Sequence, residues 1–228
     1  MRARYGQASL LLIVANIFVF GLQMIFKSSV NSFILVSSDI ITRPWIILSS
    51  MFMHASPTHL LFNMYALFLF GNLVEQRIGT KRFVGLYFAS GIVAAIGFSV
   101  FRELILNNTG AALGASGAIM GILGMTIMIF PNLKVLFFFV IPMSMRTAGI
   151  IFALIDVFGI FYPSGIANTA HLAGLAVGLL YGWYLLSKKK KITVQIINKP
   201  FKKSKQKEKG NIMLTSEEIE EYMKNGRL

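Results

Sequence analysis

Long apolar runs separated by short polar or charged segments dominate the chain. Six of them have the length or position expected of membrane-spanning helices, at about 8–26, 58–76, 83–101, 116–130, 147–161 and 167–186. The first run is too long for the apolar part of a signal peptide and lacks a small-x-small cleavage site, so we expect it to remain as an uncleaved span. The pattern therefore predicts an all-α, polytopic membrane protein with a bundle of six transmembrane helices.

Two further segments are apolar without fitting a span. The loop at 27–57 contains the run Trp45-Ile46-Ile47-Leu48, and we expect this loop to lie in the membrane interface. The apolar run at 133–143 is about 11 residues long, which is too short to cross a bilayer. Because prolines and basic residues bracket it, we expect 131–146 to form an interfacial hairpin on the cytoplasmic side.

The composition supports a membrane protein and excludes other classes. The chain has 228 residues, of which 55% are hydrophobic and 14% charged, and its mean hydropathy is +0.67. Of its 22 Lys and Arg residues, Lys27, Arg43 and Arg102 fall in predicted outer loops, and the other 19 lie at the N-terminus, in inner loops or in the tail. Six spans put both termini on the same side, and Lys188 to Lys191 predict that this side is the cytoplasm. The net charge of +13 mostly reflects this sidedness and does not indicate a nucleic-acid partner. Without Cys, the chain has no disulfide and no thiolate nucleophile.

The composition changes abruptly after residue 187. The segment 188–209 contains ten Lys and one acidic residue, as expected of a solvated or lipid-surface segment. Thr215 and Glu218 form a capping-box pattern that predicts a short helix to about Asn225. We therefore predict a transmembrane domain at 1–187 and a basic cytoplasmic tail with a short C-terminal helix at 188–228.

A serine stands where a polar loop ends and the fourth apolar helix begins, within Gly114-Ala115-Ser116-Gly117. Gly114 and Gly117 remove side chains around Ser116, so a peptide could approach its Oγ, and the N–H groups of the helix start could face a developing negative charge. A serine that only caps the helix fits this tetrapeptide as well.

All three histidines, His54, His59 and His171, lie in or beside apolar runs. A single buried His is usually a structural residue, but three of them in a membrane segment indicate function. His59 and Asn63 are four residues apart and share a helix face, where both can donate hydrogen bonds to an oxyanion. His54 is better placed to support its loop or the His59 ring.

Glycines predict which helices meet. Those of the last helix share the face of His171, and those of the fourth helix form a matching strip; they are Gly174, Gly178 and Gly182, and Gly117, Gly121 and Gly124. Close packing of the two faces would bring Ser116 beside His171. The glycines could also serve packing alone.

A metal site is the other chemistry open to the histidines. His54 and His59 lack the four-residue spacing of a His-Glu-x-x-His site, and no acidic residue lies near His171 in sequence, so we predict neither a metal nor a cofactor. Glu75 is expected to form an ion pair at a helix end near Arg77. Asp156 could orient His171, although nothing in the sequence places it there.

Together these motifs resemble the rhomboid family of intramembrane serine proteases, in its six-span bacterial or archaeal form. The resemblance covers about 8–186 and rests on His54-x4-His59-x3-Asn63, on Gly114-Ala115-Ser116-Gly117, and on His171 with the glycines that follow it. It implies a Ser116 nucleophile, a His171 general base and an oxyanion hole that contains His59 and Asn63. It also implies supporting roles for four residues, His54, Gly114, Gly117 and Met120.

The same resemblance implies single-pass membrane proteins as substrates and the lipid bilayer as surroundings, in a prokaryotic inner or plasma membrane. Two positions depart from the family pattern. Ile46 follows Trp45 where many members have Arg, although Arg43 could replace its anchoring role. Met120 stands where many members have an aromatic residue against the base, and its sulfur could contact the imidazole instead.

Two other classes remain open. A non-proteolytic member could bind membrane helices, but it would need neither Ser116 nor His171. A small transporter would show broken helices in two matching halves, and the sequence has none.

Overall fold

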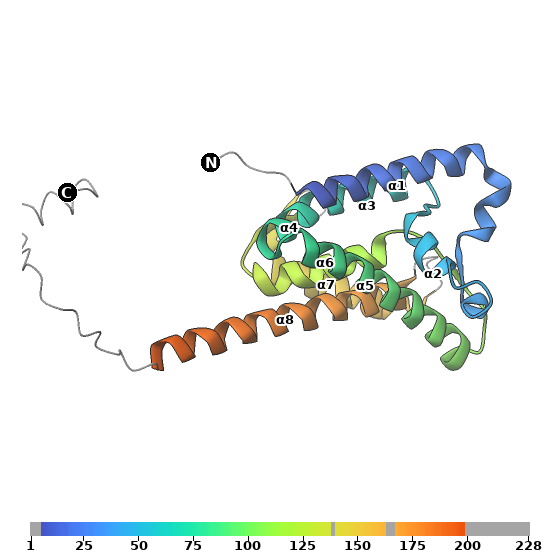
Figure 1. Ribbon diagram of the computed structural model, residues 1–228. Helices are drawn as coiled ribbons and strands as arrows, with labels where there is room; N and C mark the ends of the chain where they lie inside the picture. The colour runs from blue at the N-terminus through green and yellow to red at the C-terminus, as the bar shows by residue number, and fades with distance from the viewer. Residues whose placement is uncertain (1–5, 138–139, 163–166, 199–228) are drawn as a thin grey trace, which may run out of the picture. The chain divides into compact units, whose positions relative to one another are not determined.

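The computed structural model describes residues 6–137, 140–162 and 167–198, which are mostly helical (Figure 1). Its long helical segments are α1 (Gln7–Ile25), a continuous helix of α3 (Pro57–Ala66), π-helical η4 (Leu67–Gly71) and α4 (Asn72–Ile78), then α5 (Thr80–Val100) with π-helical η5 (Phe101–Ile105), α6 (Ser116–Ile129), α7 (Met145–Gly159) and α8 (Asn168–Asn198). Short elements in the loops are η1 (Lys27–Ser32), β1 (Leu35–Val36), η2 (Ser37–Asp39), α2 (Ile46–Ser49), η3 (Ser50–Phe52), β2 (Ala111–Ala112), β3 (Lys134–Phe137) and β4 (Ile141–Ser144). Each predicted span coincides with one long helical segment.

Three helices are long and apolar enough to cross a membrane, at Gln7–Ile25, Thr80–Ile105 and Asn168–Lys188. The number of six spans stays a prediction, because the other segments are shorter or interrupted. The helix α6, for example, has 14 residues, about 21 Å of helix against a hydrocarbon core of about 30 Å. It is apolar all round because every residue from Gly117 to Thr126 is buried in the bundle.

Contacts divide the chain into the units Met1–Lys190 and Lys191–Leu228. Of the second unit, the structure describes only the end of α8, which continues to Asn198 although the apolar run ends near residue 186. Lysine is a good helix former, so the helix does not have to end where the apolar side chains end. The predicted helix from Thr215 lies outside the described residues.

The first unit is built around α6, which packs between α5 and α8. A Cβ at Gly117 would lie 2.6 Å from the Ala94 Cβ of α5. On the α8 side, a Cβ at Gly124 would lie 2.5 Å from the carbonyl oxygen of Leu175. The predicted contact between the glycine faces of α6 and α8 is therefore confirmed, at a backbone separation that only glycine permits.

The loop after α1 is folded rather than extended, and it reaches the segment that precedes α6. Its strand β1 pairs antiparallel with β2, with Leu35 opposite Ala112. Trp45 Nε1 donates a hydrogen bond to the Ser32 carbonyl at 3.0 Å. Ile46, at the position of the family's Arg, is fully buried. Arg43 forms an ion pair with Asp39 within the loop, and its role in place of the family's Arg stays a prediction.

The segment before α7 forms the predicted hairpin. Strands β3 and β4 pair antiparallel with Lys134 opposite Ser144, and residues 138–139 at its tip lie outside the described residues. The Ser144 side chain then accepts a hydrogen bond from Thr147 N at 3.1 Å and caps α7. Its interfacial, cytoplasmic position stays a prediction.

Glu75 has a different partner from the one predicted. Its buried carboxylate accepts hydrogen bonds from the backbone N–H groups of Ala8 at 3.1 Å and Ser9 at 2.8 Å, and from Thr80 Oγ1 at 2.8 Å. It therefore caps the start of α1, where unpaired N–H groups and the helix dipole favour a negative charge. Within the described residues Glu75 forms no ion pair with a basic side chain, and its cap on α1 was not foreseen because a local sequence pattern cannot reveal a helix start 66 residues away.

Candidate active site

Ser116 and His171 come together from two helices. Ser116 is the first residue of α6, and His171 lies in the first turn of α8. The Ser116 Oγ is 2.8 Å from His171 Nε2, although the residues are 55 positions apart in sequence. This distance allows a proton to pass from the hydroxyl to the imidazole. The close contact between α6 and α8 is what brings the two helix starts together.

Gly114 shapes the backbone beside Ser116. It has φ +123, and its N–H donates to the Ser50 carbonyl at 2.8 Å. A Cβ at this position would lie 2.8 Å from His59 Cε1 and 3.0 Å from His59 Nε2. A glycine is therefore required both for the backbone conformation and for the approach of the His59 ring.

His59 and Asn63 lie on α3 and face the same cavity. Ser56 Oγ accepts a hydrogen bond from His59 N at 3.1 Å and caps the helix. The Ala55 N–H points to His59 Nδ1 at 3.4 Å, which leaves Nε2 as the protonated nitrogen on the Gly114 side. Asn63 Nδ2 donates to the His59 carbonyl at 2.9 Å and keeps a second hydrogen for another acceptor.

A cavity of about 440 Å³ collects these groups. Its lining contains four predicted site residues and six apolar neighbours: His59, Asn63, Ser116 and His171, with Ala55, Phe62, Ala111, Ala112, Leu113 and Ala167. The lining thus comes from β2 and the residue that follows it, from α3 and the loop before it, and from the starts of α6 and α8.

His54 lies beside the cavity without lining it. Its ring is fully buried and packs edge-on against His59, with 5.2 Å between ring centroids. Burial and, second, the neighbouring His59 lower the pKa of His54 to about 4, so its ring is neutral at pH 7. The supporting role that the resemblance implied for His54 stays a prediction.

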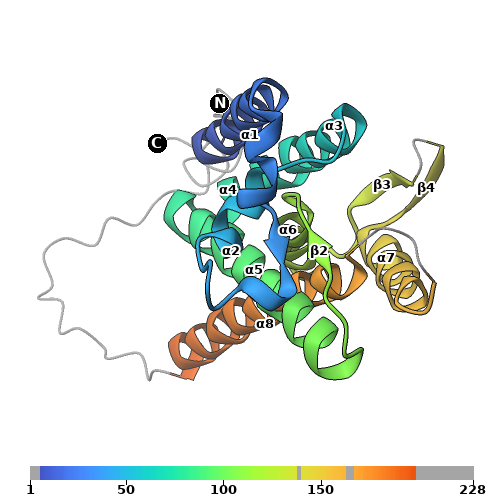
Figure 2. The ribbon, with the colours of Figure 1, turned by 90° about the vertical axis from the view of Figure 1, so that its right-hand side faces the viewer.

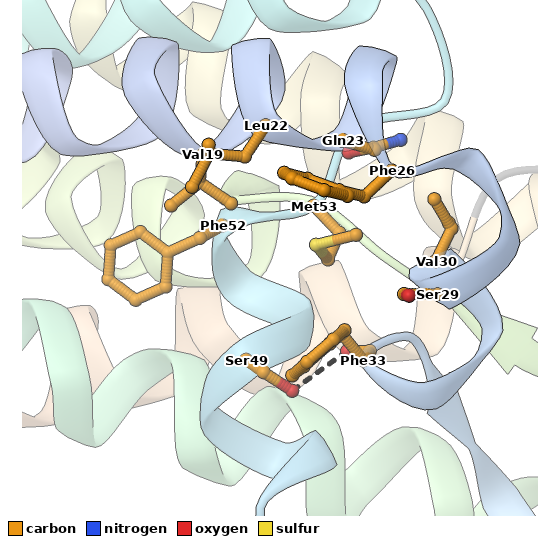
Figure 3. Close-up of a pocket in the computed structure, with 10 residues that line it drawn as sticks. All are labelled: Val19, Leu22, Gln23, Phe26, Ser29, Val30, Phe33, Ser49, Phe52 and Met53. Atoms are coloured by element: carbon orange, nitrogen blue, oxygen red, sulfur yellow. Dashed lines mark hydrogen bonds between the residues drawn. The ribbon is translucent and has the colours of Figure 1, made fainter.

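Gln23 of α1 holds the His54 backbone and was missed by the sequence analysis. Its Nε2 donates to the His54 carbonyl at 2.6 Å, and its Oε1 accepts from the His54 N–H at 3.0 Å. Figure 3 shows Gln23 above an apolar pocket of about 490 Å³ between α1 and the loop that contains Met53. A polar amide in a predominantly apolar span was the available signal.

Asp156 is the second residue that the sequence did not place. It lies on α7 and is buried, and its Oδ1 is 3.0 Å from His171 Nδ1. His171 therefore contacts a hydroxyl through one ring nitrogen and a carboxylate through the other. Asp156 and His171 are 15 residues apart, which no helical periodicity relates.

The remaining predicted residues lie close to the pair. Met120 is buried in the main core, one turn after Ser116, and its sulfur contact with the imidazole stays a prediction. Among the residues that the structure describes, no group of three or more His, Cys, Asp or Glu side chains could hold a metal ion. The chemistry available within the described site is that of a hydroxyl, an imidazole, a carboxylate and neutral hydrogen-bond donors.

The helices and the site together define a class of protein, a helical membrane bundle with a serine and a histidine in hydrogen-bond contact beside a cavity. Comparison with known families matches residues 42–188 to the Rhomboid domain. The chain therefore belongs to the rhomboid family, and it is an integral membrane protein.

Curated relatives support the same family. Rhomboid protein 1, mitochondrial, of Saccharomyces cerevisiae is 34% identical over 176 residues, which cover 75% of this chain and 51% of the yeast protein. Putative rhomboid protease YdcA of Bacillus subtilis is 34% identical over 64% of this chain and 70% of its own length. Rhomboid protease AarA of Providencia stuartii is 29% identical over 75% of this chain and 70% of its own. The chain thus spans about half the length of the yeast relative.

Proposed function

We propose that the protein is an intramembrane serine endopeptidase that cleaves peptide bonds in or near the transmembrane segments of membrane proteins. In this proposal Ser116 is the nucleophile and His171 is its general base. The observation that carries it is the 2.8 Å contact between the Ser116 hydroxyl and His171 Nε2 beside a cavity. Relatives named rhomboid proteases support the same activity.

The reaction is acyl transfer. As Ser116 Oγ attacks the carbonyl carbon, His171 Nε2 takes the hydroxyl proton and the carbonyl oxygen becomes an oxyanion. His171 then gives this proton to the leaving nitrogen as the C–N bond breaks, which leaves an ester on Ser116. Water attacks the ester, His171 takes a proton from the water and returns it to Oγ, and the new carboxyl end is released.

The oxyanion would be stabilised by donors around the cavity. His59 Nε2 faces Gly114 beside Ser116, and the second amide hydrogen of Asn63 is available on the same wall. The N–H of Ser116 opens α6, where no intrahelical acceptor exists. Such donors stabilise a developing charge more strongly in a preorganised site of low dielectric constant than in bulk water.

A second cavity, which is mostly apolar, supports the inference that the substrate enters the site from the lipid. It measures about 600 Å³ and lies between α3 and α7, with Phe62, Leu69, Met145 and Ala148 in its lining. Phe62 lines both this cavity and the one that contains Ser116. Figure 2 shows α3 and α7 on either side of the strands β3 and β4. A transmembrane helix must unwind locally to expose a peptide bond to Ser116, because its own hydrogen bonds shield the backbone.

The proposal includes the topology and the surroundings. We infer six spans, single-pass membrane proteins as substrates, and a prokaryotic inner or plasma membrane with both termini cytoplasmic. The basic residues of the predicted inner loops and tail support this orientation.

Labelling by a fluorophosphonate separates the protease from a binding protein or a transporter. We expect the purified full chain to be labelled at Ser116 and to cleave a single-span reporter in vesicles. Labelling should be lost in Ser116→Ala and in His171→Ala. A wild-type protein that folds, as judged by its thermal unfolding in detergent, but neither reacts with the probe nor cleaves the reporter would rule the proposal out.

Asn63→Ala is expected to lower kcat for the reporter by about 10²-fold or less, since the other donors around the oxyanion remain. KM should change little, because the lost hydrogen bond forms mainly in the transition state. Steady-state cleavage at several reporter concentrations measures both constants. A large rise in KM with unchanged kcat would instead assign Asn63 to substrate binding.

A further inference from the structure

The carboxylate of Asp156 lies on the opposite side of the His171 ring from Ser116. Asp156 Oδ1 is 3.0 Å from Nδ1, and Ser116 Oγ is 2.8 Å from Nε2. The Asp156 side chain is 7% exposed and that of His171 is 18% exposed. The contact is thus largely withdrawn from solvent, and the two residues come from different helices, α7 and α8.

The direction of the hydrogen bonds follows from the chemistry of the carboxylate. An ionised carboxylate can only accept, so His171 must carry a proton on Nδ1. In the neutral ring, Nε2 is then the unprotonated nitrogen and faces the Ser116 hydroxyl as an acceptor. Without a partner at Nδ1, the ring can take the other tautomer or turn away, and neither state can receive the Ser116 proton.

The apolar surroundings of Asp156 make its burial energetically unfavourable, which suits a functional residue better than a purely structural one. A buried acidic residue in an apolar helix is unfavourable in a membrane, and such residues are usually functional. The neighbours of Asp156 on α7 are apolar and face outward, with Ile155 49% exposed and Val157 41% exposed. Asp156 alone of these three turns into the bundle, toward the imidazole that contacts Ser116.

We propose that Asp156 is a positioning residue of this site, which holds the tautomer and orientation of His171 and stabilises the imidazolium that forms during catalysis. The proposal rests on the proposed function, because it assigns His171 as the base. It adds to the serine and histidine a third group, supplied by α7. Removing such a carboxylate leaves the nucleophile and the oxyanion donors in place but reduces the efficiency of proton transfer.

The test uses the full chain with Asp156→Ala, Asp156→Asn and Asp156→Glu. We expect Ala and Asn to slow fluorophosphonate labelling of Ser116 by about 10²- to 10⁴-fold. Cleavage of the single-span reporter should lose a similar factor in kcat, with KM little changed. Glu should recover part of both rates, because it keeps the carboxylate. The small probe matters because its reaction needs the base but does not need a transmembrane helix to pass α7.

Two matched controls separate positioning from stability. Val157→Ala alters the outward face of α7 next to Asp156, and we expect labelling within about twofold of wild type, as for most exposed positions. Glu75→Gln removes another buried carboxylate, the one that caps α1. It should lower the melting temperature and leave the labelling rate of the folded protein nearly unchanged.

The tautomer can be measured without any change at Asp156. The chain has three histidines, so ¹⁵N spectra of the histidine-labelled protein give few signals, and His171→Ala identifies those of His171. We expect the neutral ring to carry its proton on Nδ1. A proton on Nε2 would overturn the proposal even if the Asp156 variants failed to fold.

The other outcomes are equally decisive. If folded Asp156→Asn labels as fast as wild type, Asp156 does not position the base, while the proposed function stands. If reporter cleavage falls but labelling does not, Asp156 affects the position of α7 and the access of the substrate helix rather than the base. This result also overturns the proposal. If wild type neither labels nor cleaves, the proposed function itself fails.

Discussion

Alanine at Ser116, alanine at His171 and alanine at both positions are expected to reduce kcat for a single-span substrate by the same factor, of about 10⁶-fold. The three variants should be equal because the hydroxyl and the imidazole act as one unit across a 2.8 Å contact. Without the imidazole the hydroxyl proton has no acceptor, and without the hydroxyl the imidazole has no nucleophile to activate. Cleavage of the reporter in vesicles over long incubations measures the residual rates.

The controls for this prediction concern folding. Ser116 is a surface residue of the cavity and not a core residue, so Ser116→Ala should keep the melting temperature of the wild-type protein within a few degrees. A double variant far slower than either single variant would mean that the residues act separately. Full activity in Ser116→Ala would contradict its role as nucleophile.

Gly178→Ala is expected to disrupt the contact between α6 and α8 and to lower activity at the same time. Its Cβ would overlap the carbonyl oxygen of Gly121 and lie 2.9 Å from Met125 N, and both are backbone atoms of α6 that cannot rotate away. We expect a loss of about 1–3 kcal/mol or more in stability, as for overpacked cores. A shift of α8 by about 1 Å would also misplace His171 and cost about 10²-fold in rate. Thermal unfolding and reporter cleavage measure the two effects.

Three glycines offer matched controls for Gly178. A Cβ at Gly21 of α1 or at Gly85 of α5 would meet nothing within 4 Å, so alanine there should be neutral or slightly stabilising. A Cβ at Gly182 would meet the Met128 side chain, 2.6 Å from its Cβ and 2.8 Å from its Cγ. The Met128 Cβ moves only with α6, so Gly182→Ala should also be destabilising, but less than Gly178→Ala, whose Cβ would overlap a backbone oxygen. Equal effects at positions 178 and 85 would contradict the close helix contact.

Some of the structure was predictable because it depends on local sequence. The positions of the long helices follow from the apolar runs, and the hairpin of β3 and β4 follows from an apolar segment too short to span. The contact between α6 and α8 was also predictable, since glycines at helical spacing mark a face that permits close approach.

Other features were not predictable because their partners are distant in sequence and share no pattern. Gln23 contacts the His54 backbone across 31 residues, and Glu75 caps α1 across 66. The pairing of β1 with β2 involves two residues in each strand, too few for a periodic signal. For Gln23 and Glu75, a polar side chain in an apolar segment indicated that a partner is required but did not identify it.

From its sequence alone this chain is determined to be a helical membrane protein of rhomboid character, with Ser116, His59, Asn63 and His171 as the candidate chemistry, because apolar length and residue type are local properties. Only the tertiary structure decided that His171 contacts Ser116 and Asp156 at once. Those distances depend on how closely α6, α7 and α8 approach one another, and that approach is set by backbone contacts between glycines and by polar pairing across the bundle.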